Sequence, residues 1–109
     1  MLLRIFFIFI FLSIQIKNST QKSDLLIKYE KAIAYYESQQ PTAETDSIAL
    51  NYLIQIINDP SNTSLESKVL LDAYEKAGNL YLINNDFEKA IAFYRSGLAF
   101  NYKQDVFET

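Results

Sequence analysis

Beyond about residue 22, hydrophobic positions recur at steps of three and four residues, the spacing of one face of an α-helix. Pro41, the pair Asp59-Pro60 and the pair Asn84-Asn85 separate four such stretches, and these residue types commonly end helices. No stretch in this region has the two-residue alternation of a β-strand. The pattern therefore predicts an all-α fold of four helices joined by short turns.

Polar residues beside the stretches predict where three of these helices begin. Ser23 or Asp24 is the expected N-cap of the first helix, Ser64 or Ser67 that of the third, and Asp86 that of the fourth. The expected helices cover residues 23–40, 42–58, 64–84 and 86 onward. The positions expected to be buried are Leu25, Leu26, Tyr29, Ile33 and Tyr36, then Ile48 or Ala49, Tyr52, Leu53, Ile56 and Ile57, then Leu70, Ala73, Tyr74, Ala77, Leu80, Tyr81 and Asn84, and finally Phe87, Ala90, Ile91, Tyr94 and Leu98.

Residues 1–20 have a different pattern. Arg4 precedes a mainly apolar run, residues 5–16, and polar residues follow from Lys17, which is the order of a secretory signal. As a helix, residues 5–16 reach only about 18 Å, well short of the roughly 30 Å hydrocarbon core of a bilayer. We therefore expect residues 1–20 to be a signal peptide, with a short uncleaved membrane anchor as the alternative. Either one places the protein in the periplasm, in the cell envelope or outside the cell, with membrane contact only through this segment.

The composition excludes most kinds of catalytic site. The 109 residues include no Cys and no His, which excludes thiol nucleophiles, disulfides, zinc fingers and every catalytic triad with a His base. The sequence has no glycine-rich phosphate loop. Its carboxylates mostly lie near helix starts or three to four residues from a Lys, as caps and surface ion pairs do. We therefore expect that the protein is not an enzyme and that it binds no cofactor and no metal.

The charge balance argues against nucleic acid as a ligand. After residue 20 the chain has 13 acidic residues against 8 basic ones, and the basic residues are scattered singly among the acids. Binding to nucleic acid requires clustered Lys and Arg that neutralise phosphates. The expected partner is therefore a protein or a peptide.

Over residues 71–104, aromatic and small side chains occupy complementary places. They are Tyr74, Gly78, Tyr81, Phe87, Ala90 and Tyr94. Antiparallel helices approach closely only where small side chains face large ones. This segment resembles one tetratricopeptide repeat (TPR) of the usual 34 residues, and the resemblance implies a short TPR-like α-solenoid of stacked antiparallel helix pairs over residues 21–109. The two predicted pairs are offset by about 41 to 44 residues, as in longer variants of such repeats.

Helical repeats behind a secretory signal resemble the extracytoplasmic sensor regions of some bacterial sensor histidine kinases and related regulators. The resemblance implies a non-catalytic protein–protein interaction scaffold in the bacterial envelope, and more specifically the sensor part of a signalling protein. In such solenoids the first helix of each pair lines the concave face. By this analogy Lys76, Asn79, Leu82 and Ile83 are the expected partner-binding residues.

The C-terminal end of the chain allows two interpretations. Phe93 and Phe100 lie off the predicted stripe of the fourth helix, on the side where a following helix would pack, and together with Phe107 they would form an exposed aromatic edge. In the first interpretation the chain is truncated within a longer array, whose next helix covers this edge. In the second it is a small free-standing secreted helical protein that self-associates through Phe93, Phe100 and Phe107.

Overall fold

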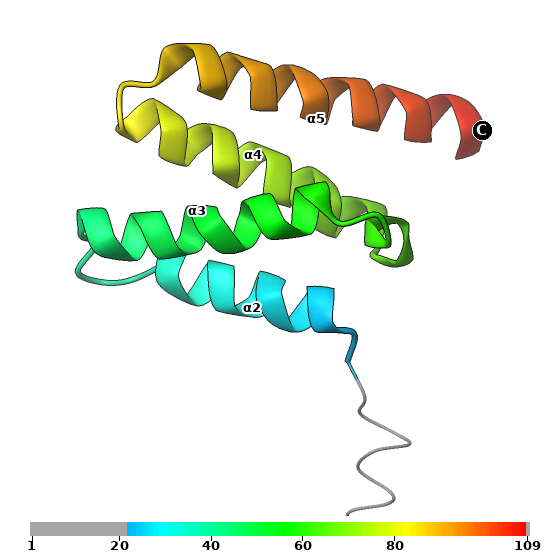
Figure 1. Ribbon diagram of the computed structural model, residues 1–109. Helices are drawn as coiled ribbons and strands as arrows, with labels where there is room; N and C mark the ends of the chain where they lie inside the picture. The colour runs from blue at the N-terminus through cyan, green and yellow to red at the C-terminus, as the bar shows by residue number, and fades with distance from the viewer. Residues whose placement is uncertain (1–21, 109) are drawn as a thin grey trace, which may run out of the picture.

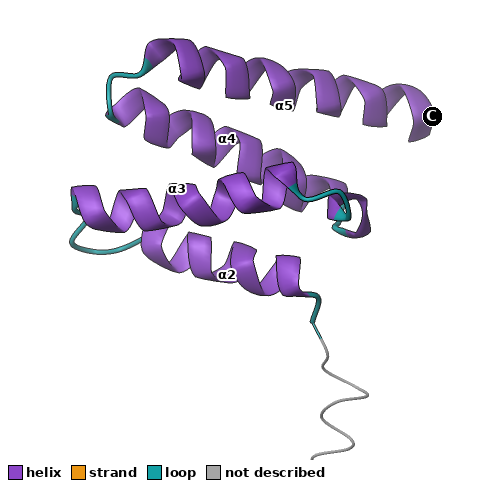
Figure 2. Cartoon of the chain, viewed as in Figure 1, coloured by secondary structure: helices purple, strands orange, loops and turns teal. Residues whose placement is uncertain are grey.

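The computed structural model of the chain describes residues 22–108, with side chains described as far as Lys103. It contains four α-helices: α2 (Asp24–Tyr36), α3 (Ala43–Asn58), α4 (Ser67–Ile83) and α5 (Phe87–Glu108). A single 3₁₀ turn, η1 (Asn62–Ser64), precedes α4. The described range has no strand (Figure 2). The prediction of an all-α fold with four helices is confirmed, whereas the predicted signal segment, residues 1–20, lies outside the described residues.

Each helix runs antiparallel to the one before it, and the four follow one another through the molecule in chain order (Figure 1). α2 lies at one edge of this arrangement and α5 at the other. α4 begins 43 residues after α2, and α5 begins 44 residues after α3. These offsets agree with the expected spacing of the two helix pairs.

Polar residues cap the helices at most of the predicted positions. The Ser23 hydroxyl accepts a hydrogen bond from the Leu26 N–H at 3.2 Å, and the Asp86 carboxylate accepts one from the Lys89 N–H at 3.4 Å. α4 ends at a turn in which Asn85 adopts a left-handed backbone with a φ of 62°, a conformation that Asn tolerates better than most residues. The predicted caps at Ser23 and Asp86 are thus confirmed, as is the asparagine turn.

Two helix boundaries differ from the prediction. α2 ends at Tyr36 rather than at Gln40, since the chain must reverse before Pro41 and a residue that precedes proline is disfavoured in helical geometry. α4 begins at Ser67, and its N-cap is Glu66, which makes no side-chain capping hydrogen bond. Ser64 instead ends the 3₁₀ turn.

The core consists of small and aliphatic side chains in two neighbouring clusters. The first comprises Ala32 of α2, Ala49 and Leu53 of α3, and Ala73, Ala77 and Leu80 of α4. The second comprises Leu25 of α2, Ile56 of α3 and Leu70 of α4. Since four of these nine residues are alanines, the three helices can approach one another closely.

α5 turns a different face to the core from the one predicted. Its inward side presents Ala90 and Gly97, which are buried, with Phe93 and Phe100 packed against the core clusters. Of the predicted stripe, Phe87 is 57% exposed, Ile91 50% and Leu98 69%. Ala90 is buried as predicted. The face differs because α5 crosses α4 closely, and only small residues fit at the crossing. With Ala90 and Gly97 there, the centre of the buried face lies about 100° around the helix from the centre of the predicted stripe.

Candidate functional site

Six side chains form a continuous set of polar contacts in which residues of α2 and of α5 both reach α4. They are Tyr29 and Tyr36 of α2, Asp72, Lys76 and Asn79 of α4, and Tyr94 of α5, and we call this set the polar row. The three α4 residues are spaced by four and three positions, so they share one face of that helix. The polar row therefore joins three helices through side chains alone.

Asp72 is the centre of one half of the polar row. Its Oδ2 accepts a hydrogen bond from the Tyr29 hydroxyl at 2.5 Å, and its Oδ1 lies 2.6 Å from Nζ of Lys76. Both members of the Asp72–Lys76 ion pair are largely shielded, with side chains 26% and 20% exposed. Burial, and then the hydrogen bond to Asp72, raise the pKa of the Tyr29 hydroxyl far above its usual value. Tyr29 is therefore neutral at ordinary pH and acts as a hydrogen-bond donor.

Asn79 is the centre of the other half. Its Nδ2 donates a hydrogen bond to the Tyr36 hydroxyl at 3.0 Å, and its Oδ1 accepts one from the Tyr94 hydroxyl at 2.5 Å. Nζ of Lys76 lies 5.3 Å from the centroid of the Tyr36 ring, within range of a cation–π contact. One amide thus ties α4 both to α2 and to α5.

The structure brings together two of the four residues predicted to bind a partner. Lys76 and Asn79 lie in the polar row and are partly buried, whereas Leu82 and Ile83 lie at the C-terminal end of α4 with 45% and 65% of their surface exposed. Ile83 also lines a cleft of about 620 Å³ between the end of α4 and the start of α3, with Pro41 among the residues that line it. Tyr36 of the polar row lines the same cleft, so the cleft adjoins the polar row.

The hydrophobic pattern alone does not bring Tyr29, Tyr36 and Asp72 together with Lys76 and Asn79. A signal was available, because Tyr29 and Asp72 are separated by 43 positions and so are Tyr36 and Asn79. That separation equals the offset between the starts of α2 and α4. Equivalent positions of the two helices therefore face each other.

The residues that resemble a TPR lie mostly between α4 and α5. The Tyr81 ring lies 5.2 Å from that of Phe93, and Ala90 is 1% exposed. Gly78 is buried so tightly that an added Cβ would lie 2.5 Å from the Tyr94 ring. Phe87 differs from the expectation, since it lies in the first turn of α5 with its side chain exposed.

The expected aromatic edge at the C-terminal end must also be corrected. Phe93 and Phe100 pack against the core clusters, and the Phe100 ring lies 6.3 Å from that of Tyr74. They point inward because the rotation of α5 places them beside Ala90 and Gly97 on its buried side. The side chain of Phe107 lies outside the described residues.

Among the side chains described, residues 22–103, no three His, Cys, Asp or Glu residues are grouped so that they could hold a metal ion. None of the helices between residues 22 and 108 combines the length and the hydropathy needed to cross a bilayer.

Comparison with known proteins returned no relative. No protein-family model matches the chain, and neither the curated proteins nor the solved structures include a significant match. Functional inference therefore rests on the polar row and on the surfaces beside it.

Proposed function

We propose that this domain is a non-catalytic interaction scaffold that binds a protein or peptide along the face of α2 and α4 that bears the polar row. The observation that supports this function is the polar row itself, in which three tyrosines, an amide and a Lys lie together in partly exposed positions. Tyrosines, which combine a ring with a hydroxyl, are typical of protein recognition surfaces. Because the side chains of the polar row already hold one another in place, binding would cost little additional side-chain ordering.

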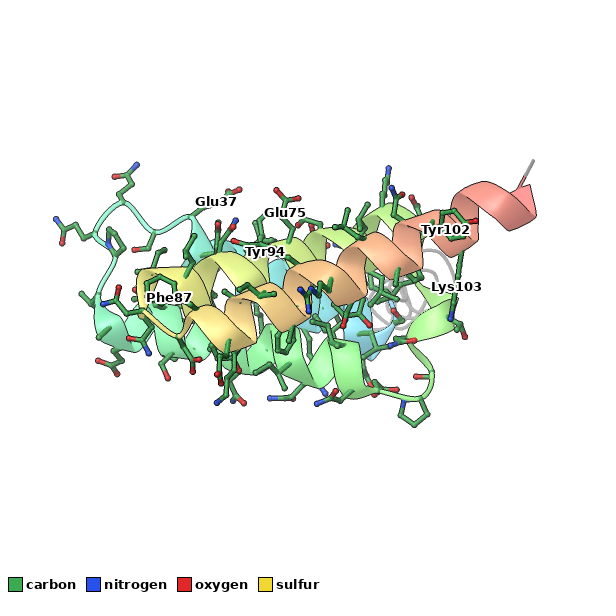
Figure 3. The ribbon with its side chains drawn as sticks, turned by 90° about the horizontal axis from the view of Figure 1, so that it is seen from above. Glu37, Glu75, Phe87, Tyr94, Tyr102 and Lys103 are labelled. Atoms are coloured by element: carbon green, nitrogen blue, oxygen red, sulfur yellow. The ribbon has the colours of Figure 1, made fainter. Side chains whose placement is uncertain are left out.

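The surroundings of the polar row favour a partner with both apolar and basic groups. Leu82 and Ile83 supply exposed apolar surface at one end of α4. Glu37 and Glu75, both exposed, project from the same side of the molecule (Figure 3). An extended or helical segment with a hydrophobic side chain and a nearby Lys or Arg would complement this surface.

A more specific proposal follows from the sequence pattern. The helix pairs would form a short TPR-like solenoid, residues 1–20 would direct its export, and the domain would act in the bacterial envelope, periplasm or extracellular space as the sensor part of a signalling protein. The residues that resemble a TPR and the 43- to 44-residue offset between helix pairs support the solenoid. The charged, apolar and polar order of residues 1–22 supports export.

The test is cross-linked capture of partners from envelope extract with the full chain and with Lys76→Glu and Asn79→Ala variants. Lys31→Glu is the matched control, because Lys31 is exposed and lies about 200° around α2 from Tyr29, away from the polar row. We expect both polar-row variants to lose a specific partner about tenfold or more, and the control to retain it. Equal recovery by all four chains, each with unchanged helix content by circular dichroism, would disprove this assignment.

A further inference from the structure

An apolar stripe follows the outer flank of α5. Phe87, Ile91, Leu98 and Tyr102 are 57%, 50%, 69% and 70% exposed. With the half-buried Tyr94 they recur at steps of four, three, four and four residues, which places all five within about 80° of the helix circumference. Figure 3 looks down on α5 and shows Phe87 at its start and Tyr102 toward its end. In Figure 1 α5 lies at the edge of the molecule. The stripe runs beside the buried face, separate from the polar row except at Tyr94.

The spacing of this stripe matches an antiparallel helix pair. Phe87, Ile91, Tyr94 and Leu98 alternate steps of four and three, as the seam of a coiled coil does. If a second α5 lies antiparallel with a two-fold axis between residues 92 and 93, Phe87 is level with Leu98 of the second copy, each about 8 Å from the axis. Ile91 is then level with Tyr94 of the second copy. Every layer of this pairing joins two apolar side chains.

Charges beside the stripe fit the same arrangement. Glu88 and Arg95 are both exposed and lie on the same flank of the stripe, seven residues apart. In the antiparallel pair Glu88 lies within about 3 Å, along the axis, of Arg95 of the second copy, which forms two symmetric ion pairs. A parallel pair would instead place the flanks that bear these residues on opposite sides of the seam, so Glu88 would not meet Arg95. Among the described side chains, residues 22–103, neither Glu88 nor Arg95 has an ion-pair partner.

The available area fits a weak dimer. Of the seam residues, Phe87, Ile91 and Leu98 are 57%, 50% and 69% exposed, and at about 200 Å² each they offer roughly 350 Å² of apolar surface per chain. Two chains would bury about 700 Å² through these residues, the size of a weak or transient interface. The seam is continuous, the Tyr94 hydroxyl is bonded to Asn79 of the same chain, and charges lie only along the border.

We propose that the occupant of the α5 stripe is a second copy of this chain, bound antiparallel through Phe87, Ile91, Tyr94 and Leu98 with reciprocal Glu88–Arg95 ion pairs. This surface meets the polar row only at Tyr94, so dimerisation would leave the α2 and α4 residues of the partner face open. One dimer would then present two partner-binding faces.

Charge reversal tests the register. The dimer dissociation constant of the full chain is measured by sedimentation equilibrium for the native protein, Glu88→Arg, Arg95→Glu and the double variant. Each single reversal should weaken the dimer roughly tenfold, because two attractive pairs become repulsive, and the double variant should return close to the native value. If the losses instead add in the double variant, the proposed register is wrong.

Single cysteines test the orientation, since the native chain contains none. Two Ile91→Cys residues would lie about 5 Å apart along the axis, whereas two Tyr102→Cys residues would lie about 28 Å apart. A bis-maleimide of about 10 Å should therefore cross-link the Ile91→Cys chain but not the Tyr102→Cys chain. Equal cross-linking of the two would indicate a parallel or non-specific contact and would refute the proposal.

Maleimide labelling of Leu98→Cys distinguishes the occupants of the stripe. Protection that appears only as protein concentration rises supports a second copy. Protection at every concentration, with a monomeric sedimentation profile, would show that another segment of the same chain covers the stripe. Rapid labelling at all concentrations would show that nothing covers it. Either of the last two results would overturn the proposed dimer.

Discussion

At the scale of single residues, the Tyr29 hydroxyl links proton binding to stability. Only the neutral hydroxyl can donate to Asp72, and burial with that hydrogen bond raises the Tyr29 pKa. In the unfolded chain a tyrosine loses its proton near pH 10. Above that pH the folded state holds more protons than the unfolded state does. The free energy of unfolding must therefore fall as pH rises through this range.

We expect Tyr29→Phe to change both the level and the slope of stability. Near pH 7 the variant should be less stable by about 1 kcal/mol, because the hydrogen bond is lost and Asp72 keeps one fewer partner. From about pH 10 to about pH 11 its stability should fall less steeply than that of the native chain. Urea denaturation across this range measures both quantities.

Tyr35→Phe is the matched control, since Tyr35 lies on α2 but is 38% exposed. Its pH profile should follow that of the native chain. An identical slope in the native chain and in Tyr29→Phe would contradict the link between Tyr29 and alkaline stability.

At the scale of helices, the close spacing of α4 and α5 depends on two glycines, each of which packs against a tyrosine of the other helix. An added Cβ on Gly78 would meet the Tyr94 ring at 2.5 Å, and one on Gly97 would meet the Tyr74 Cβ at 3.1 Å. Neither glycine has a positive φ, so the requirement is for space and not for backbone freedom.

We expect Gly78→Ala to destabilise the protein by about 1–3 kcal/mol, because the Tyr94 ring must move. The same substitution combined with Tyr94→Ala should have the opposite sign and stabilise that background by about 0.5–1 kcal/mol, since Ala is a better helix former than Gly. Thermal or urea unfolding of the four chains measures this. If Gly78→Ala is stabilising in both backgrounds, the helices are not in close contact at this point.

The elements were more predictable than their orientation. Ser23, Asp86 and Asn85 were identified from local chemistry, because a cap or a left-handed turn depends on neighbouring residues only. The rotation of α5 was not, since its largest hydrophobic residues suggested one stripe, while the close crossing with α4 buries Gly97 beside Ala90, which was expected to be buried. Packing distance between helices is a tertiary property, and a single-helix pattern does not encode it.

At the scale of the whole molecule, one residue joins the two helix pairs. Leu53 of α3 is completely buried, in a cluster that also takes Ala32 from α2 and Leu80 from α4. We expect Leu53→Ala to cost about 2–5 kcal/mol, through lost burial and the cavity that remains. Urea denaturation should show one cooperative transition shifted to lower denaturant.

Leu82→Ala serves as the comparison, because Leu82 is 45% exposed. It should change the free energy of unfolding by less than about 0.5 kcal/mol. Similar losses for the two variants, or a second transition in Leu53→Ala alone, would contradict a single shared core.

The candidate site was only half predictable, because contacts between helices are a tertiary property. Lys76 and Asn79 were selected by analogy with the concave face of helical repeats, and the structure places both in the polar row. Tyr29 and Tyr36 were expected in the buried stripe of the first helix, and their contacts were not predicted, because their polar partners lie 43 positions away on a helix that is not their neighbour in sequence.

The equal 43-residue separations have a consequence for insertions and deletions. A residue added in the turn between α2 and α3, or in the loop between α3 and α4, lengthens the connection but leaves Tyr29 and Tyr36 seven positions apart, as Asp72 and Asn79 are. A residue added within α2 between the two tyrosines would rotate one of them by about 100° and break one of the two contacts. Length variation in this protein should therefore be tolerated in the loops and rejected in the two-turn segments 29–36 and 72–79.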